Sequence, residues 1–82
     1  MNLTEGFTRD VNLPGWAHQS IWGYDDRLGC YWAALWRDDD HNDAPTISFS
    51  VYHAIPTIPL LVRRLADALH LPDAKVYRAL TT

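Results

Sequence analysis

Apolar and polar residues alternate most clearly near the middle of the chain. Over residues 46–55, four apolar positions alternate with polar or aromatic ones: Ile47, Phe49, Val51 and Ile55 against Thr46, Ser48, Ser50 and Tyr52. A period of two is typical of a half-buried strand. An apolar run over residues 30–36 precedes it, and residues 37–45 between them contain four Asp, one Asn and one Pro. Such a joint breaks a helix and favours a loop, so the pattern predicts a β-hairpin.

The strand at residues 30–36 is apolar on both of its faces. We expect Trp36 to face Ile47, which puts Cys30, Trp32, Ala34 and Trp36 on the inner face. The opposite face then carries Tyr31, Leu35 and Tyr52. A strand with one wet face should alternate cleanly, so this second face is expected to be covered. The N-terminal segment, a second copy of the chain or a partner protein are the alternatives.

The residues before this hairpin predict one more strand. Residues 20–24 form a short apolar run, and residues 25–29 combine Asp and Gly as a turn does. This predicts a three-stranded antiparallel meander, in which Gly23 marks a bulge or a close approach. Residues 1–15 are expected to be a flexible or docking arm, with a helix over them as a weaker alternative, and residues 16–82 a single small domain.

The residues after the hairpin predict two helices. Thr57 is a suitable N-cap, and Pro59 is tolerated in the first turn of a helix. An amphipathic pattern then runs to about His70, where Pro72 stops it, and a shorter helix starts near Asp73. The inner side of that second helix is expected to hold Val76, Tyr77 and Leu80. The predicted fold class is therefore α+β, in the order β-β-β-α-α, with both helices on one face of the sheet.

Composition and charge limit the function classes. The chain has 82 residues, 48% of them hydrophobic, which excludes a disordered polymer. A single cysteine rules out an internal disulfide framework. With no signal peptide and no membrane span expected, a cytoplasmic location is predicted. The net charge is −5 over residues 1–56 and +2 over residues 57–82, which favours an acidic partner for the tail or its docking on the acidic body.

The C-terminal helices resemble the helix-turn-helix of DNA-binding repressors. The resemblance covers residues 65–80 and rests on Ala66, Leu71 and Val76, followed by Tyr77 and Arg78. His70 stands where that motif usually has Gly. The resemblance implies that Lys75, Tyr77 and Arg78 face a DNA groove. The competing interpretation is that the two helices only cover the sheet, because DNA affinity depends largely on phosphate neutralisation and this chain is acidic.

Two other patterns partly match a metal site and a catalytic pair, but each lacks a required residue. Asp38, Asp40 and Asn42 copy the first half of a calcium loop, but Asp43 replaces the required Gly and Phe49 the bidentate Glu. We therefore expect no metal site, and interpret Asp38, Asp39 and Asp40 as an acidic contact surface. Cys30 and His53 would be cross-strand neighbours, as a nucleophilic pair is, but no third group orients them. We expect no catalytic residue and no cofactor.

The function predicted from these patterns is a small non-catalytic protein-interaction module, acting as an adaptor, inhibitor or regulator. The expected contact residues are Tyr31, Leu35 and Tyr52 on the aromatic sheet face, with Asp38, Asp39 and Asp40 in the loop. The partner is another protein or a second copy of the chain, and no membrane. The alternative is a DNA-binding regulator that uses residues 65–80.

Overall fold

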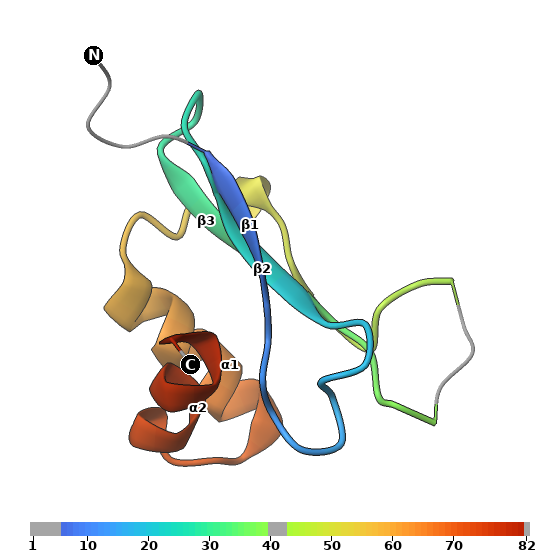
Figure 1. Cartoon of the computed structure of the whole chain (residues 1–82). Coiled ribbons are helices and arrows are strands. Elements are labelled where there is room, and N and C mark those ends of the chain that lie inside the picture. Colours follow the sequence, from blue (N-terminus) through green and yellow to red (C-terminus); the bar gives the residue numbers. More distant parts are fainter. Residues whose placement is uncertain (1–5, 40–42, 82) are drawn as a thin grey trace.

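The computed structural model describes residues 6–39 and 43–81 (Figure 1). A four-stranded antiparallel sheet is followed by two helices. The elements in chain order are β1 (Phe7–Asp10), β2 (Ile21–Asp25), β3 (Cys30–Leu35), β4 (Ile47–Phe49), the 3₁₀ helix η1 (Val51–His53), α1 (Ile58–Leu69) and α2 (Asp73–Thr81). The spatial order of the strands is β1-β2-β3-β4, so each strand pairs with its neighbour in sequence. The predicted α+β class is confirmed, and the predicted strand count is one too low.

The additional strand, β1, lies within residues 1–15, where the sequence suggested an arm. It pairs antiparallel with β2, with Phe7 opposite Tyr24. Gly23 on β2 permits this approach, because a Cβ there would overlap the Phe7 carbonyl oxygen and stand 2.6 Å from the Trp32 ring. The close approach predicted at Gly23 is thus confirmed, and the alternative of a helix over this segment is wrong.

The register between β3 and β4 differs from the prediction by one residue. Leu35 lies opposite Ile47 and Ala33 opposite Phe49, whereas the prediction placed Trp36 and Ala34 there. A shift of one residue turns every side chain of a strand to the other face. Consequently Tyr31, Ala33 and Leu35 point to the helices, and Trp32, Ala34 and Trp36 point away from them.

β4 is shorter than the predicted strand over residues 46–55. After Phe49 the chain turns into η1, where the Ser50 hydroxyl and the His53 ring form a reciprocal capping box. The His53 Nδ1 atom accepts a hydrogen bond from the Ser50 N–H at 2.9 Å. Ile55 then returns to the sheet as an isolated bridge opposite Tyr31. Local capping therefore replaces the second half of the strand.

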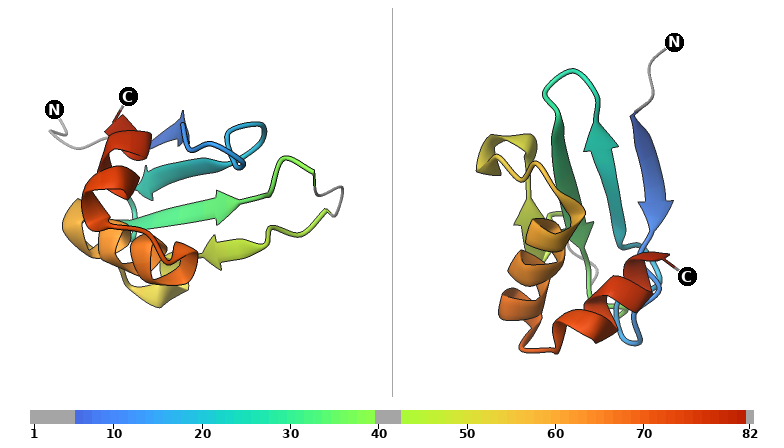
Figure 2. Two further views of the ribbon diagram at one scale, coloured as in Figure 1. Left: turned by 90° about the horizontal axis from the view of Figure 1, so that it is seen from below. Right: turned by 90° about the vertical axis from the view of Figure 1, so that its left-hand side faces the viewer.

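The first helix begins and ends, and the second begins, where the sequence predicted. The Thr57 side chain accepts a hydrogen bond from the Leu60 N–H, which caps α1. His70 ends α1 in the left-handed conformation at φ 57°, the role that Gly often fills. Leu61 and Leu65 of α1 are fully buried against the sheet, together with Leu35. Both helices lie on the same face of the sheet (Figure 2).

The segment between β1 and β2 ties the sheet to α2. Val11 and Leu13 are buried in the core, and the Asn12 N–H donates to the Ala79 carbonyl at 2.8 Å. On the sheet side, the Ser20 hydroxyl accepts from the Trp36 N–H at 2.9 Å and lies 3.2 Å from the Trp36 carbonyl oxygen. The core thus lies between the helices and the end of the sheet that contains Leu35. Neither described helix is long and apolar enough to cross a bilayer.

Candidate functional site

The face of the sheet opposite the helices is apolar. We call Ile21 on β2 and Trp32, Ala34 and Trp36 on and just after β3 the tryptophan face. All four residues are half-buried, and neither helix lies on this side (Figure 2). Ile21 and Ala34 are cross-strand partners, so they join the two tryptophans into a continuous surface. Aromatic surfaces of this kind are enriched in protein–protein interfaces.

Both tryptophans of this face are held in fixed positions. Trp32 packs over Gly23, where only a glycine leaves room for its ring. The Trp36 indole N–H donates to the Asp43 carbonyl at 3.3 Å, while its backbone is held by Ser20. The tryptophan face is therefore a rigid surface, and a partner need not order it on binding.

The helices leave one end of the sheet uncovered (Figure 2, right). A second group of aromatic residues lies on the strands at this end, on the helix-bearing face. We call Phe7, Tyr24 and Tyr31 the aromatic row, since they are cross-strand neighbours on β1, β2 and β3. The Tyr24 and Tyr31 ring centres are 4.7 Å apart, and those of Phe7 and Tyr24 6.3 Å. The Arg9 guanidinium lies 5.1 Å from the Phe7 ring centre. All three rings are half-buried, so part of each faces solvent.

The sequence-predicted sheet contacts do not form one surface. The structure places Tyr31 in the aromatic row, half-buried, whereas Leu35 has 0% exposed surface and belongs to the core. Tyr52 is 91% exposed and lies on η1. The expectation that Tyr31 and Leu35 share an uncovered face is wrong, because the register shift turns that face towards the helices. It is the tryptophan face that stays uncovered.

The predicted acidic loop lies at the opposite end of β3 from Tyr31. Asp38 and Asp39 are exposed, and Asp40 lies outside the described residues. The Asp38 carboxylate accepts the His18 N–H at 2.8 Å, and the Asp38 N–H donates to Gly15. Asp38 thus joins two loops, and Asp39 lies with it in the lining of a groove between these loops and the helices.

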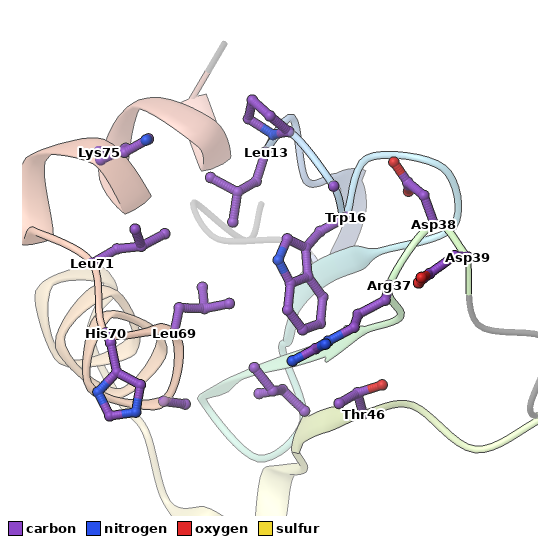
Figure 3. A pocket seen from close by; sticks show the side chains of 14 residues that line it. Leu13, Trp16, Arg37, Asp38, Asp39, Thr46, Leu69, His70, Leu71 and Lys75 are labelled. Carbon is purple, nitrogen blue, oxygen red and sulfur yellow. The ribbon is translucent and has the colours of Figure 1, made fainter.

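A hollow in the described surface lies between these loops and the helices (Figure 3). It is a groove of about 670 Å³ with an apolar floor that includes Leu13, Leu69 and Leu71. On one wall the Arg37 guanidinium lies 5.4 Å from the Trp16 ring centre, and Lys75 stands on the other wall. This groove could not be predicted from the sequence, because its residues come from separate segments of the chain.

The predicted DNA-contacting residues lie on α2. Lys75 and Arg78 are exposed and one turn apart, and Tyr77 is 53% exposed. Tyr77 leans towards α1, where it lines a shallow hollow with Val62. The expectation that Tyr77 belongs to the inner side of α2 is wrong, since Ala79 takes that place beside Val76 and Leu80. Here α2 faces the core with one side and solvent with the other.

The structure separates Cys30 from His53. In the observed register Cys30 lies opposite Asp25, and its thiol is 3.3 Å from the Leu28 carbonyl. The His53 ring is engaged with Ser50 instead. Within residues 6–39 and 43–81, no group of three or more His, Cys, Asp or Glu side chains could hold a metal ion.

Sequence reasoning missed the aromatic row and the β1 edge. The signal that could have found both was Phe7, because an aromatic residue followed by Thr favours a strand, yet Gly6 and the spacing of Phe7 and Val11 suggested otherwise. No protein-family model, no curated protein and no solved structure matches this chain.

Proposed function

We propose that this chain is a small non-catalytic protein-interaction module that binds its partner through the tryptophan face. One observation carries the proposal: both helices lie on one side of the sheet, while Trp32, Ala34 and Trp36 line the other. A continuous apolar surface with rigid aromatic side chains and a polar border is typical of a binding surface. Exposed Ser48, opposite Ala34 on β4, supplies that border on one side, and Thr8, which lines a hollow with Trp32, on the other.

The proposal is tested by placing a charge in the middle of the tryptophan face. Ala34→Glu keeps both tryptophans but puts a carboxylate between them, so partner binding should weaken at least about tenfold, as a buried unpaired charge does. Ala17→Glu is the matched control, because Ala17 is exposed in the loop before β2. Affinity capture from cell extract compares the proteins retained by the wild-type chain and by both variants, each verified as folded by circular dichroism.

The expected result is a set of proteins that the wild-type chain and Ala17→Glu retain and Ala34→Glu loses. Sedimentation over a range of concentrations shows whether that partner is a second copy of the chain. If all three chains retain the same proteins and sediment alike, the tryptophan face is not the binding surface.

The second candidate function is DNA binding through α2. It is favoured by the turn at His70, which adopts the left-handed conformation that the helix-turn-helix motif requires there, and by the exposure of Lys75 and Arg78. Fluorescence anisotropy with duplex DNA at low and moderate salt tests it. Salt-sensitive binding that Lys75→Ala and Arg78→Ala both weaken would support this function. No binding at low salt would exclude it.

A further inference from the structure

We propose that β1 is a docking edge, to which an extended peptide adds as a further strand of the sheet. The peptide carries an acidic, a basic and an aromatic side chain at three successive positions. This inference rests on the proposed function and specifies how a partner segment is recognised beside the tryptophan face. It is carried by the backbone of β1 and by the charges on its two faces.

The backbone groups of β1 point alternately towards β2 and away from it. The Val11 N–H donates to the Ser20 carbonyl at 3.0 Å, so these two residues form a hydrogen-bonded pair. In an antiparallel ladder every second pair is of this kind, which makes Arg9 the next residue bonded to β2. The N–H and C=O groups of Thr8 and Asp10 therefore point outward.

These outward groups are open to a partner. The next outward residue, Asn12, donates its N–H to Ala79 of α2, so the helix closes the edge there. Within the described part of the chain, β1 is an edge strand whose one neighbour is β2, so no strand faces the outward groups of Thr8 and Asp10. No helix lies beside the upper end of β1 (Figure 2, right). An exposed edge with unpaired donors and acceptors is the template used in strand addition.

On the helix-bearing face, an added strand would meet Phe7 and Arg9. Phe7 is the outer member of the aromatic row, so a neighbouring aromatic side chain would extend the row across the new strand. The Arg9 guanidinium has no carboxylate within ion-pair distance among the described residues. A carboxylate of the peptide opposite Arg9 would supply that partner.

On the opposite face, the added strand would meet Thr8 and the hollow beside it. This hollow measures about 520 Å³, and its lining includes Thr8 and Trp32. Two carboxylates, Asp25 and Asp26, and one cation, Arg27, also line it, so its net charge is negative. A Cβ on Gly6 would stand 3.4 Å from the Asp26 carboxylate, which shows that the acid lies on this face. A lysine or arginine fits here, because its stem can pack on Trp32 while its charge approaches Asp26.

These subsites fix the order of the three side chains. In an antiparallel strand, which pairs slightly more stably than a parallel one, the peptide residue opposite Arg9 comes first. The residue opposite Thr8 follows, and the residue opposite Phe7 comes third. The favoured sequence is therefore acidic, basic, aromatic.

A second copy of β1 fits this edge less well. If two antiparallel β1 strands paired around Arg9, the two guanidinium groups would lie directly opposite each other. If they paired around Thr8, the Asp10 carboxylate of one copy would lie opposite Gly6 and close to Asp26 of the other. Like charges directly opposite each other destabilise a strand pair, so both registers are unfavourable.

The experiment uses the whole chain and a capped synthetic peptide, Thr-Val-Glu-Lys-Tyr-Val-Thr. NMR titration measures binding, and amide hydrogen exchange locates it. We expect exchange at Thr8 and Asp10 to slow about tenfold or more on saturation, while Arg9, already bonded to β2, changes little. A control peptide with Glu and Lys exchanged has the same composition and net charge, and should bind about tenfold more weakly.

Two variants of one residue separate the backbone from the side chain. Asp10→Pro removes the outward N–H without touching a bond to β2, and should weaken peptide binding at least about tenfold. Asp10→Ala keeps the N–H and should bind like the wild-type chain. Arg9→Glu should abolish the preference between the two peptides. If Asp10→Pro disturbs the NMR spectrum of the sheet, Thr8→Pro replaces it.

Three results would overturn the proposal. The first is peptide binding that leaves exchange at Thr8 and Asp10 unchanged, and the second is the absence of binding by either peptide at millimolar concentration. The third is concentration-dependent dimerisation that Asp10→Pro abolishes, which would assign the edge to a second copy. If Ala34→Glu loses a captured protein that Asp10→Pro retains, the proposed function stands and the docking edge does not.

Discussion

The two outer strands of the sheet leave their outward backbone groups in different states. At β4, the chain turns after three residues and the His53 ring accepts the N–H of Ser50, the residue just after the strand, so this edge is short. At β1, Thr8 and Asp10 present their groups to solvent. Natural sheets usually block their edges against other chains. The longer edge of β1 is therefore the one on which the proposed strand addition rests, while β4 offers a shorter stretch of backbone.

The largest expected effect comes from proline on the two sides of the β1 backbone. Arg9→Pro removes an N–H that bonds to β2 and should lower the free energy of unfolding by about 3 kcal/mol, the upper end of the cost of leaving a buried carbonyl group unpaired. Asp10→Pro removes an outward N–H and should cost less than about 1 kcal/mol. Urea unfolding followed by tryptophan fluorescence measures both. Equal losses for the two variants would contradict the assignment of the Arg9 N–H to the β2 side and of the Asp10 N–H to the solvent side.

Gly23→Ala tests the close packing of β1 on β2 without a change in the sequence of β1. The added Cβ would overlap the Phe7 carbonyl and the Trp32 ring, so either β1 or the tryptophan must move. We expect a loss of about 2 kcal/mol in the free energy of unfolding, as overpacking causes. Gly6→Ala is the milder comparison, because its Cβ would stand 3.2 Å from the Tyr24 carbonyl oxygen, a tight contact but not an overlap. An unchanged stability in Gly23→Ala would contradict the close approach of the two strands.

His53→Ala should leave the Ser50 N–H at the end of β4 without a protein acceptor, as the outward N–H groups of β1 are. The Ser50 N–H loses its acceptor, which costs about 1 kcal/mol, as the loss of a cap does. Hydrogen exchange at Ser50 should accelerate, and the freed edge should promote aggregation at high concentration. Tyr52→Ala is the control, since Tyr52 lies in the same turn and is 91% exposed. If Ser50 exchanges equally fast in all three chains, the His53 ring does not protect this edge.

The helices could be predicted from the sequence because their limits are set locally. Thr57, Pro59 and Pro72 act within a turn of their own positions, and each does in the structure what its chemistry predicts. The faces of β3 could not be predicted in this way. Tyr31 and Leu35 on one side are as apolar as Trp32 and Trp36 on the other, so alternation alone carries no information about which side is inside.

The choice between the two faces of β3 depends on contacts distant in sequence. Leu35 is buried because Leu61 and Leu65 of α1 pack over it, and nothing in residues 30–36 encodes that. The strand β1 could not be predicted for a similar reason. Residues 7–10 pair with β2, and this pairing requires Gly23, where a Cβ would overlap the Phe7 carbonyl oxygen. The contact residues predicted on the sheet were assigned to the wrong face because the predicted register was wrong by one residue. The exposure of Lys75 and Arg78 could be predicted, because the helical period alone places them on the outer side of α2.

The hydrogen bond between Asn12 and Ala79 has a consequence for how the chain folds. Each strand pair joins neighbours in sequence and closes a short loop, so the meander can form early at little entropic cost. The Asn12–Ala79 bond joins the two ends of the described chain, and it can form only when α2 docks. We therefore expect exchange of the Asn12 amide hydrogen in the native state to report the opening of α2 separately from the loss of the sheet.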